Sequence, residues 1–304
     1  MEALSGTQHE LRHGDQIVTV VEVGAGLRSY SVGRRNIIDG YAETEMCTGA
    51  RGHTMIPWPN RIESGRYEWD GTEHQLDLSE PSKGGAIHGL TRWASWELID
   101  RDENRASFGH TLYACPGWQW VLECRLDYSL DDSGLTVRTS AKNMGPGSCP
   151  YGTGAHPYLT VGTATIDPAY AQVPGRVYLP VDDLGIPTGH SQVEGTHYDL
   201  RIEQEIGGRE IDVTYTDLHR GADGRARVRL SLPDGPAVSL WTDPAYPYLE
   251  IFTGDTLPQP ERRRTGLGVE PMTCAPNAFN SGDGLIVLEP GQSHTASWGI
   301  EPFA

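Results

Sequence analysis

Residues 118–141, WQWVLECRLDYSLDDSGLTVRTSA, indicate the fold class of this chain. Polar and apolar side chains alternate along Trp118–Leu130, which is typical of a strand with one buried face. Asp131-Asp132-Ser133-Gly134 then supplies turn residues, and alternation resumes over Leu135–Ala141. The stretch predicts a long antiparallel hairpin.

The same combination of a short strand-like run and a turn recurs along the chain. Further runs are Ile17–Val23, Arg66–Trp69 before His74-Gln75-Leu76, Arg227–Leu232 before Ala237–Trp241, and Leu285–Leu288 before His294–Ile300. No window of about 11 residues keeps a helical apolar period. The sequence therefore predicts an all-β protein, a large antiparallel β-sandwich with few short helices.

Composition supports this prediction and excludes several classes of protein. Gly and Pro number 37 and 21 of 304 residues, and both break long helices. Hydrophobic residues make up 37% of the chain, too many for a disordered one. The net charge of −17 disfavours binding to nucleic acid and to anionic membranes.

Localisation and domain organisation follow from features that the sequence lacks. It has no apolar stretch of about 18 residues for a membrane span and no apolar core of a signal peptide near its start. The five cysteines show no zinc-site spacing, so a cytoplasmic protein with free thiols is expected. We expect one domain over residues 1–304, with residues 39–60, 143–160 and 255–282 forming long loops over one face.

Three ionisable residues stand out because their surroundings carry almost no charge. His156 lies in the uncharged segment 143–166, Glu270 is the only charged residue of 265–282, and His88 is the only ionisable one of 84–91. Apolar surroundings raise the pKa of a carboxyl group and lower that of an imidazole. Two such groups facing one ligand would form a general acid and a general base.

Each of these residues has a structural alternative, since a single loop His or Glu often only supports its neighbours. The repetition of the pattern favours a functional interpretation. Two other chemistries lack a signal: there is no GxSxG nucleophile motif and no glycine-rich phosphate loop.

Four segments in order carry a resemblance to a known family. They are Pro57-Trp58-Pro59-Asn60-Arg61-Ile62, Ala86-Ile87-His88-Gly89-Leu90, Gly154-Ala155-His156-Pro157-Tyr158 and Val269-Glu270-Pro271-Met272. This set is similar to that of the aldose 1-epimerase (galactose mutarotase) family, over about residues 15–302. The last segment resembles a bacterial subgroup. The resemblance implies a β-supersandwich with a shallow site that interconverts the α and β anomers of free aldoses without metal or organic cofactor.

The resemblance also implies roles for individual residues. Glu270 matches the general base that takes the C1 hydroxyl proton, and His156 matches the acid that protonates the ring oxygen. Arg61 and His88 match sugar-binding residues, and Asn60 and Tyr158 are expected to support the site. An aspartate of the family is matched to Asp212, with Asp199 and Asp217 as alternatives.

Two other functions remain open on the sequence. A mutarotase for an anionic sugar, such as a hexose 6-phosphate or a sulfonated hexose, would need a cationic pocket. The candidate arginines are Arg34-Arg35, Arg176 and Arg262-Arg263-Arg264. A non-catalytic sugar-binding protein on the same fold is the other alternative. The expected partner is a small-molecule sugar, and the expected state is a monomer or homodimer.

Overall fold

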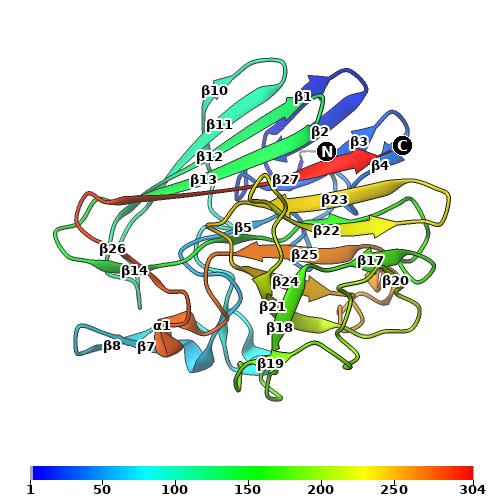
Figure 1. The fold of residues 1–304 in the computed structure, drawn as a ribbon. Helices are drawn as coiled ribbons and strands as arrows, with labels where there is room; N and C mark the ends of the chain where they lie inside the picture. The colour runs from blue at the N-terminus through cyan, green and yellow to red at the C-terminus, as the bar shows by residue number, and fades with distance from the viewer. Residues whose placement is uncertain (1–2, 304) are drawn as a thin grey trace.

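The computed structural model describes residues 3–303, in which almost all regular structure is β-strand (Figure 1). Residues 1, 2 and 304 of the expected domain lie outside this range. Within it, the helical elements are one α-helix and three 3-10 turns: α1 (Ala278–Ser281), η1 (Glu63–Gly65), η2 (Pro81–Lys83) and η3 (Pro260–Arg262). The prediction of an all-β protein with few short helices is confirmed.

The larger of two extended sheets has nine strands, all paired antiparallel. In spatial order they are β10 (Glu97–Arg101), β11 (Arg105–Leu112), β12 (Leu122–Asp131), β13 (Gly134–Asn143), β27 (Ser293–Phe303), β23 (Ala237–Thr242), β22 (Ala226–Ser231), β17 (Tyr170–Gln172) and β20 (Gln204–Glu205).

The second extended sheet has eight strands and carries the residues of greatest chemical interest. Its order is β19 (Ser191–Gln192), β18 (Gly175–Leu179), β21 (Asp212–Leu218), β24 (Tyr248–Phe252), β25 (Leu267–Met272), β15 (Gly154–Ala155) and β5 (Thr54–Met55), with β16 (Tyr158–Leu159) also paired to β25.

Smaller sheets complete the fold. One has four strands, β1 (Gln8–His13), β2 (Gln16–Val21), β3 (Leu27–Val32) and β4 (Arg35–Asn36), and packs against β11 and β12 (Figure 1). The two-stranded pairs are β6 (Arg61–Ile62) with β9 (Ala86–Ile87), β7 (Arg66–Trp69) with β8 (Thr72–Gln75), and β14 (Cys149–Tyr151) with β26 (Ile286–Leu288).

The predicted central hairpin is β12–β13, and its turn has the expected chemistry. Asp131 pairs with Gly134, and an Asp131 carboxylate oxygen accepts a hydrogen bond from the Ser133 amide at 2.8 Å. Side chains of β12 alternate between buried and more exposed positions, as the sequence pattern requires. The strand begins later than predicted, at Leu122, because Trp118 folds back in a tight turn that is closed by backbone hydrogen bonds to Cys115.

The prediction of long loops at 39–60, 143–160 and 255–282 was wrong in part. These segments contain β5, β14, β15, β16 and β25, and β25 lies in the interior of the eight-stranded sheet. All six residues of β25 are buried, so it lacks the alternation by which a strand with one exposed face is recognised.

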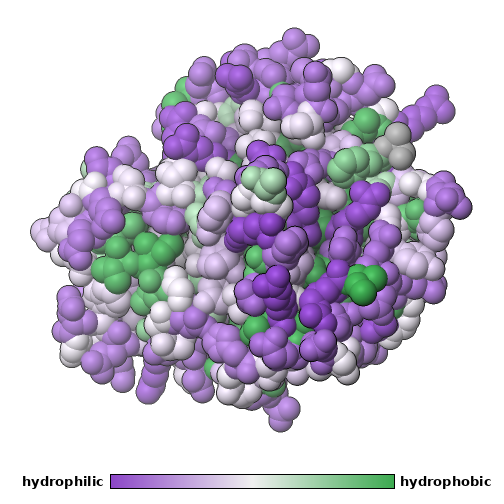
Figure 2. Space-filling view, in the orientation of Figure 1, coloured by the Kyte–Doolittle hydropathy of each residue, from purple (hydrophilic) through white to green (hydrophobic). Residues whose placement is uncertain are grey.

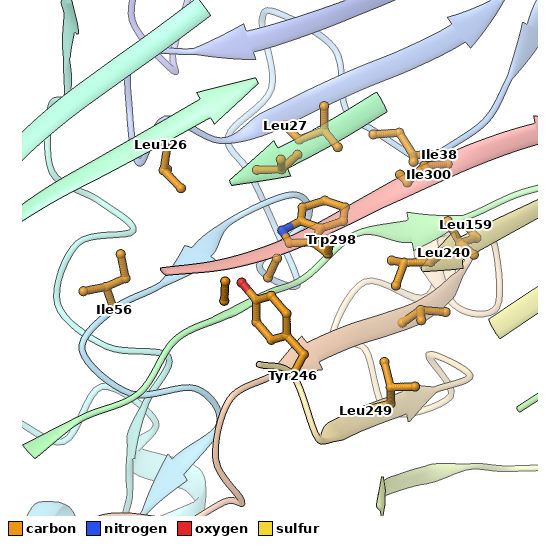
Figure 3. Packing of buried hydrophobic residues seen from close by; sticks show 14 of the residues in the cluster. Leu27, Ile38, Ile56, Leu126, Leu159, Leu240, Tyr246, Leu249, Trp298 and Ile300 are labelled. Atoms are coloured by element: carbon orange, nitrogen blue, oxygen red, sulfur yellow. The ribbon is translucent and has the colours of Figure 1, made fainter. Parts of the chain in front are cut away.

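The core lies between the two extended sheets (Figure 3). Trp298 and Ile300 of β27 lie in one cluster with Tyr246 and with Leu249 of β24 (Figure 3). All four are at most 2% exposed, and the interior is therefore built from aromatic and branched side chains of both sheets.

The outer surface is mostly hydrophilic on the face shown in Figure 2, as expected for a chain with a net charge of −17. No helix in residues 3–303 has the length and apolar character needed to span a bilayer.

Trp298→Ala should lower the free energy of unfolding by about 3–5 kcal/mol, because truncating a buried aromatic ring leaves a cavity. Phe303→Ala on the same strand is the matched control, since its ring is 40% exposed. We expect the control to cost less than about 1 kcal/mol. Urea unfolding followed by tryptophan fluorescence measures both, and equal losses would contradict this description of the core.

Candidate active site

Glu270 stands in the middle of β25 and is 3% exposed. Its position is fixed by strand pairing on both sides, because β25 pairs with β24 on one side and with β15 and β16 on the other. Glu250 of β24 is its direct partner in register. Residues directly opposite each other in an antiparallel pair project from the same face, so these two carboxyl groups are neighbours.

His156 lies between β15 and β16 and is brought against Glu270. Its Nε2 is 3.1 Å from Glu270 Oε1. Backbone hydrogen bonds hold the residue: its amide donates to His53 O at 3.0 Å, and its carbonyl accepts from the Gly52 amide at 2.9 Å. The predicted acid and base are therefore in direct contact in a buried environment.

The His156 ring is supported by a stack of side chains. Tyr158 lies parallel to it, with ring centroids 5.0 Å apart and an interplanar angle of 17°. The Tyr158 hydroxyl donates to Gly49 O at 2.8 Å, and the Arg51 guanidinium lies 4.5 Å from the Tyr158 ring centroid. Tyr158 therefore lies directly against the His156 ring.

His88 approaches His156 edge to face, with ring centroids 5.2 Å apart. Its backbone φ of 62° is in the left-handed region, and its amide donates to Asn60 O at 2.9 Å. Gly89 follows with φ 69°, where a Cβ atom would come within 2.1 Å of Ile56 O. The His-Gly pair is therefore required by the backbone path that turns the His88 ring toward His156.

Asn60 and Arg61 enter the site from the other strand of the small β6–β9 sheet, where Arg61 pairs with Ile87. The Asn60 side-chain oxygen accepts from the Arg61 amide at 2.8 Å. The Arg61 guanidinium forms a two-bond fork with Glu80, at 2.6 and 3.0 Å. Because Glu80 already neutralises it, Arg61 brings hydrogen-bond donors but little net charge.

Of the three candidate aspartates, Asp212 lies beside the buried carboxyl groups. It begins β21, next to β24, and its charge acts on both Glu250 and Glu270. Asp199 is bound to Arg201 by two 2.8 Å hydrogen bonds. Asp217 is exposed, 4.0 Å from Arg176.

Burial reverses the usual order of the pKa values of His156 and Glu270. Burial lowers the pKa of His156 to about 3. Burial, and then the carboxyl groups of Glu250 and Asp212, raise the pKa of Glu270 well above its ordinary value. Both shifts favour the uncharged forms of the two residues in contact, neutral imidazole and protonated carboxyl.

Two residues of the site were missed by the sequence analysis, although the signal it used was present. Glu250 is the only charged residue of 244–254, and His53 is the only ionisable one of 52–60. Both are at least 96% buried. The lack of charge around Glu250 and His53 is the same signal that marks His88, His156 and Glu270.

His88, His156 and Glu270 are also the cluster whose donor atoms, all within 4.8 Å of one another, could hold a cation. Two atoms of this cluster, His156 Nε2 and Glu270 Oε1, are 3.1 Å apart.

The arginines proposed for an anionic substrate have other roles in the structure. Arg262 binds Asp39 at 3.2 Å, and Arg263 donates to Leu257 O at 2.7 Å. Arg264 binds both Asp167 and Asp255, at 2.5 and 2.7 Å. Arg34 and Arg35 lie at the β3–β4 hairpin. None of these contacts places a free guanidinium at His156 or Glu270 in the described residues.

Comparison with known proteins identifies the family of this chain. The profile of the Aldose 1-epimerase family matches residues 7–301. The uncharacterized protein YihR of Escherichia coli (strain K12) is 33% identical over 298 residues, which cover 97% of this chain and 93% of that protein. The chain therefore belongs to the aldose 1-epimerase family, and the resemblance seen in its motifs is confirmed.

Solved structures show the same fold at low sequence identity. The GalM/aldose epimerase homologue from C. elegans has a TM-score of 0.87 and 16% identity, with 98% of each chain covered. Galactose 1-epimerase from Lactobacillus acidophilus has a TM-score of 0.79 and 20% identity, covering 98% of this chain and 95% of its own. The predicted galactose mutarotase-like fold is thereby confirmed.

His53→Gln should make the folded protein less sensitive to acid. Burial lowers the pKa of His53 to about 3, whereas an unfolded histidine takes up a proton near pH 6.5. Below pH 6.5 the unfolded state therefore binds more protons, and the folded state loses stability as pH falls. Between pH 7.5 and pH 5 the wild type should lose about 2 kcal/mol more than the variant.

Urea unfolding at a series of pH values measures this difference. The two proteins should show parallel stability between pH 7.5 and 8.5, which serves as the internal control. Parallel curves down to pH 5 would contradict a neutral, buried His53.

Proposed function

We propose that this protein is an aldose 1-epimerase that interconverts the α and β anomers of a free hexose. The observation that carries the proposal is the buried contact of His156 Nε2 with Glu270 Oε1 at 3.1 Å. Glu270 Oε2 is buried and has no hydrogen-bond partner among the described residues, so the protein leaves one acceptor of the proposed base unsatisfied. Anomer exchange requires one base and one acid, and this pair supplies both.

The reaction moves one proton from one sugar oxygen to another. The Glu270 carboxylate takes the proton of the C1 hydroxyl while C1–O1 becomes a carbonyl. The bond from C1 to the ring oxygen breaks, its electron pair stays on that oxygen, and protonated His156 donates a proton to it. Rotation about C1–C2 and the reverse transfers close the ring on the other face. No oxidant, reductant or further reactant is consumed.

In this proposal His156 and Glu270 share one proton, and the position of that proton decides whether the pair is reactive. A sugar bound between the two residues would replace their direct contact: Glu270 would contact the C1 hydroxyl and His156 would contact the ring oxygen. The form with protonated His156 and ionised Glu270 opens the ring, and the form with the proton on Glu270 is its product. Both forms hold the same number of protons, so the site needs no exchange with solvent during turnover.

The surrounding residues bind and orient the sugar. His88 Nδ1 is buried without a partner in residues 3–303, and Arg61 keeps donors beyond its fork to Glu80. Asp212 is exposed and can accept hydrogen bonds from sugar hydroxyls. Asn60 and Tyr158 hold the backbone and the His156 ring.

Glu270→Gln and His156→Asn should each lower kcat by about 10²–10⁴-fold, because each removes one proton-transfer group. Polarimetry on freshly dissolved α-glucose and α-galactose measures the rate. Glu123→Gln is the matched control, an exposed glutamate on β12. Near wild-type rates in either site variant would refute its role.

The same experiment addresses the sugar-binding alternative. A wild-type protein that binds sugar, as shown by a saturable thermal shift, but does not speed anomer exchange would be a non-catalytic binding protein.

One observation favours the second candidate function, a mutarotase for an anionic hexose. Arg92 is half-buried, and within residues 3–303 its guanidinium has no carboxylate or carbonyl partner. It lies 5.7 Å from the ring centroid of Trp93, and the Trp93 ring contacts His53 edge to face at 4.9 Å. His53 in turn holds the His156 backbone. An unpaired, partly desolvated cation this close to the acid would be stabilised by an anionic group on the substrate.

Arg92→Gln tests this candidate. If the substrate is anionic, the variant should raise KM at least tenfold for glucose 6-phosphate or a sulfonated glucose and leave KM for glucose unchanged. The exposed Arg138→Gln on β13 is the control. Polarimetry with glucose, galactose and both anionic sugars side by side would reject the candidate if all four substrates respond alike.

A further inference from the structure

We propose that Glu250 is a positioning residue for this reaction: its carboxyl group keeps a proton of its own at neutral pH and so maintains Glu270 as the ionisable base of the strand pair. The inference rests on the proposed function. Glu250 lies outside the four segments that carry the family resemblance.

Strand register places Glu250 in line with the base. Thr214 of β21 pairs with Glu250 of β24, and Glu250 pairs with Glu270 of β25. The three side chains therefore stand in one row on one face of the eight-stranded sheet, each at most 4% exposed. Two ionised carboxylates directly opposite each other destabilise a sheet, and burial strengthens the repulsion.

Two groups on β21 hold the Glu250 carboxyl. The Thr214 hydroxyl donates to Glu250 Oε2. Asp212, two residues earlier on the same strand and hence on the same face, lies beside the Glu250 carboxyl. A protonated Glu250 can donate to a neighbouring carboxylate, which an ionised one cannot.

The cation nearest this row does not offset its charge. Arg61 of β6 acts on Glu250, Asp212 and Glu270, but its guanidinium is bound by the Glu80 fork. Lys83 acts only on the outer member, Asp212, and its ammonium donates to Asp183 O at 2.6 Å. Protons must therefore reduce the charge of the three carboxyl groups. Burial, and then the charge of Asp212, raise the pKa of Glu250 to about 8.

Protonation of Glu250 has a direct consequence for the reaction. Opposite a neutral Glu250, Glu270 can be ionised while His156 holds the shared proton, which is the form that opens the ring. An ionised Glu250 would place a negative charge opposite Glu270. The shared proton would then move from His156 to Glu270, and Glu270 could no longer act as the base. Activity should therefore decline as pH rises through about 8.

Glu250→Gln tests the proposal, because glutamine resembles the neutral acid and cannot ionise. The readout is the ratio of kcat at pH 9 to kcat at pH 7, by polarimetry. In the wild type the ratio should be about one tenth, one pH unit beyond the titration. In the variant it should lie within about twofold of one, and Glu123→Gln should behave as the wild type. A wild-type ratio in Glu250→Gln would overturn the proposal.

Thr214→Val provides a second variant in case Glu250→Gln does not fold. The Thr214 hydroxyl stabilises the ionised form of Glu250 and so lowers the pKa of that carboxyl group. Without it the alkaline decline should move to higher pH. A decline that stays in place or moves to lower pH would contradict the proposed role.

An infrared difference measurement separates this proposal from the proposed function. The wild-type minus Glu250→Gln spectrum should contain a protonated carboxyl band at pH 6.5 that is lost above pH 9. This band is expected even if no sugar is turned over, in which case the aldose 1-epimerase activity fails and the protonation of Glu250 stands. A carboxylate signal at pH 6.5 would reject the protonation whatever the activity.

Discussion

The contact between His156 and Glu270 is the constraint on which the arrangement of the site depends. It connects strand β25, which carries Glu270, to the turn between β15 and β16, which carries His156, and both side chains are buried. An isolated buried charge costs several kcal/mol, so burial favours the uncharged forms of both groups. The Tyr158 stack and the backbone hydrogen bonds of His156 with Gly52 and His53 hold that geometry.

The site as a whole balances its charges locally. Arg61 is neutralised by Glu80, and His156 lies in direct contact with Glu270. In our proposal Glu250 carries a further proton beside Asp212. The net charge of −17 thus describes the exterior, much of which is hydrophilic in Figure 2, and says little about the field a bound sugar would meet. Arg92 is the cation that this balance leaves without a partner in the described residues.

Sequence patterns predicted those parts of the fold and site in which one residue or one short run carries the information. The alternation of β12 and β13 and the turn at Asp131–Gly134 were readable because each strand has one buried face. Strand β25 was taken for a loop because both of its faces are buried and its pattern is uniform. Glu250 was missed, although its window has the same lack of charge as those of His156 and Glu270.

The sequence by itself determined the fold class, the family and the residue types of the proposed acid–base pair, since these depend on local alternation, turn residues and ordered motifs. Only the tertiary structure decided which side chains meet. The row of Thr214, Glu250 and Glu270 exists because residues far apart in the chain fall in register across three strands. Register depends on the packing of a whole sheet against its core, and a shift of one residue would turn each of these side chains to the other face.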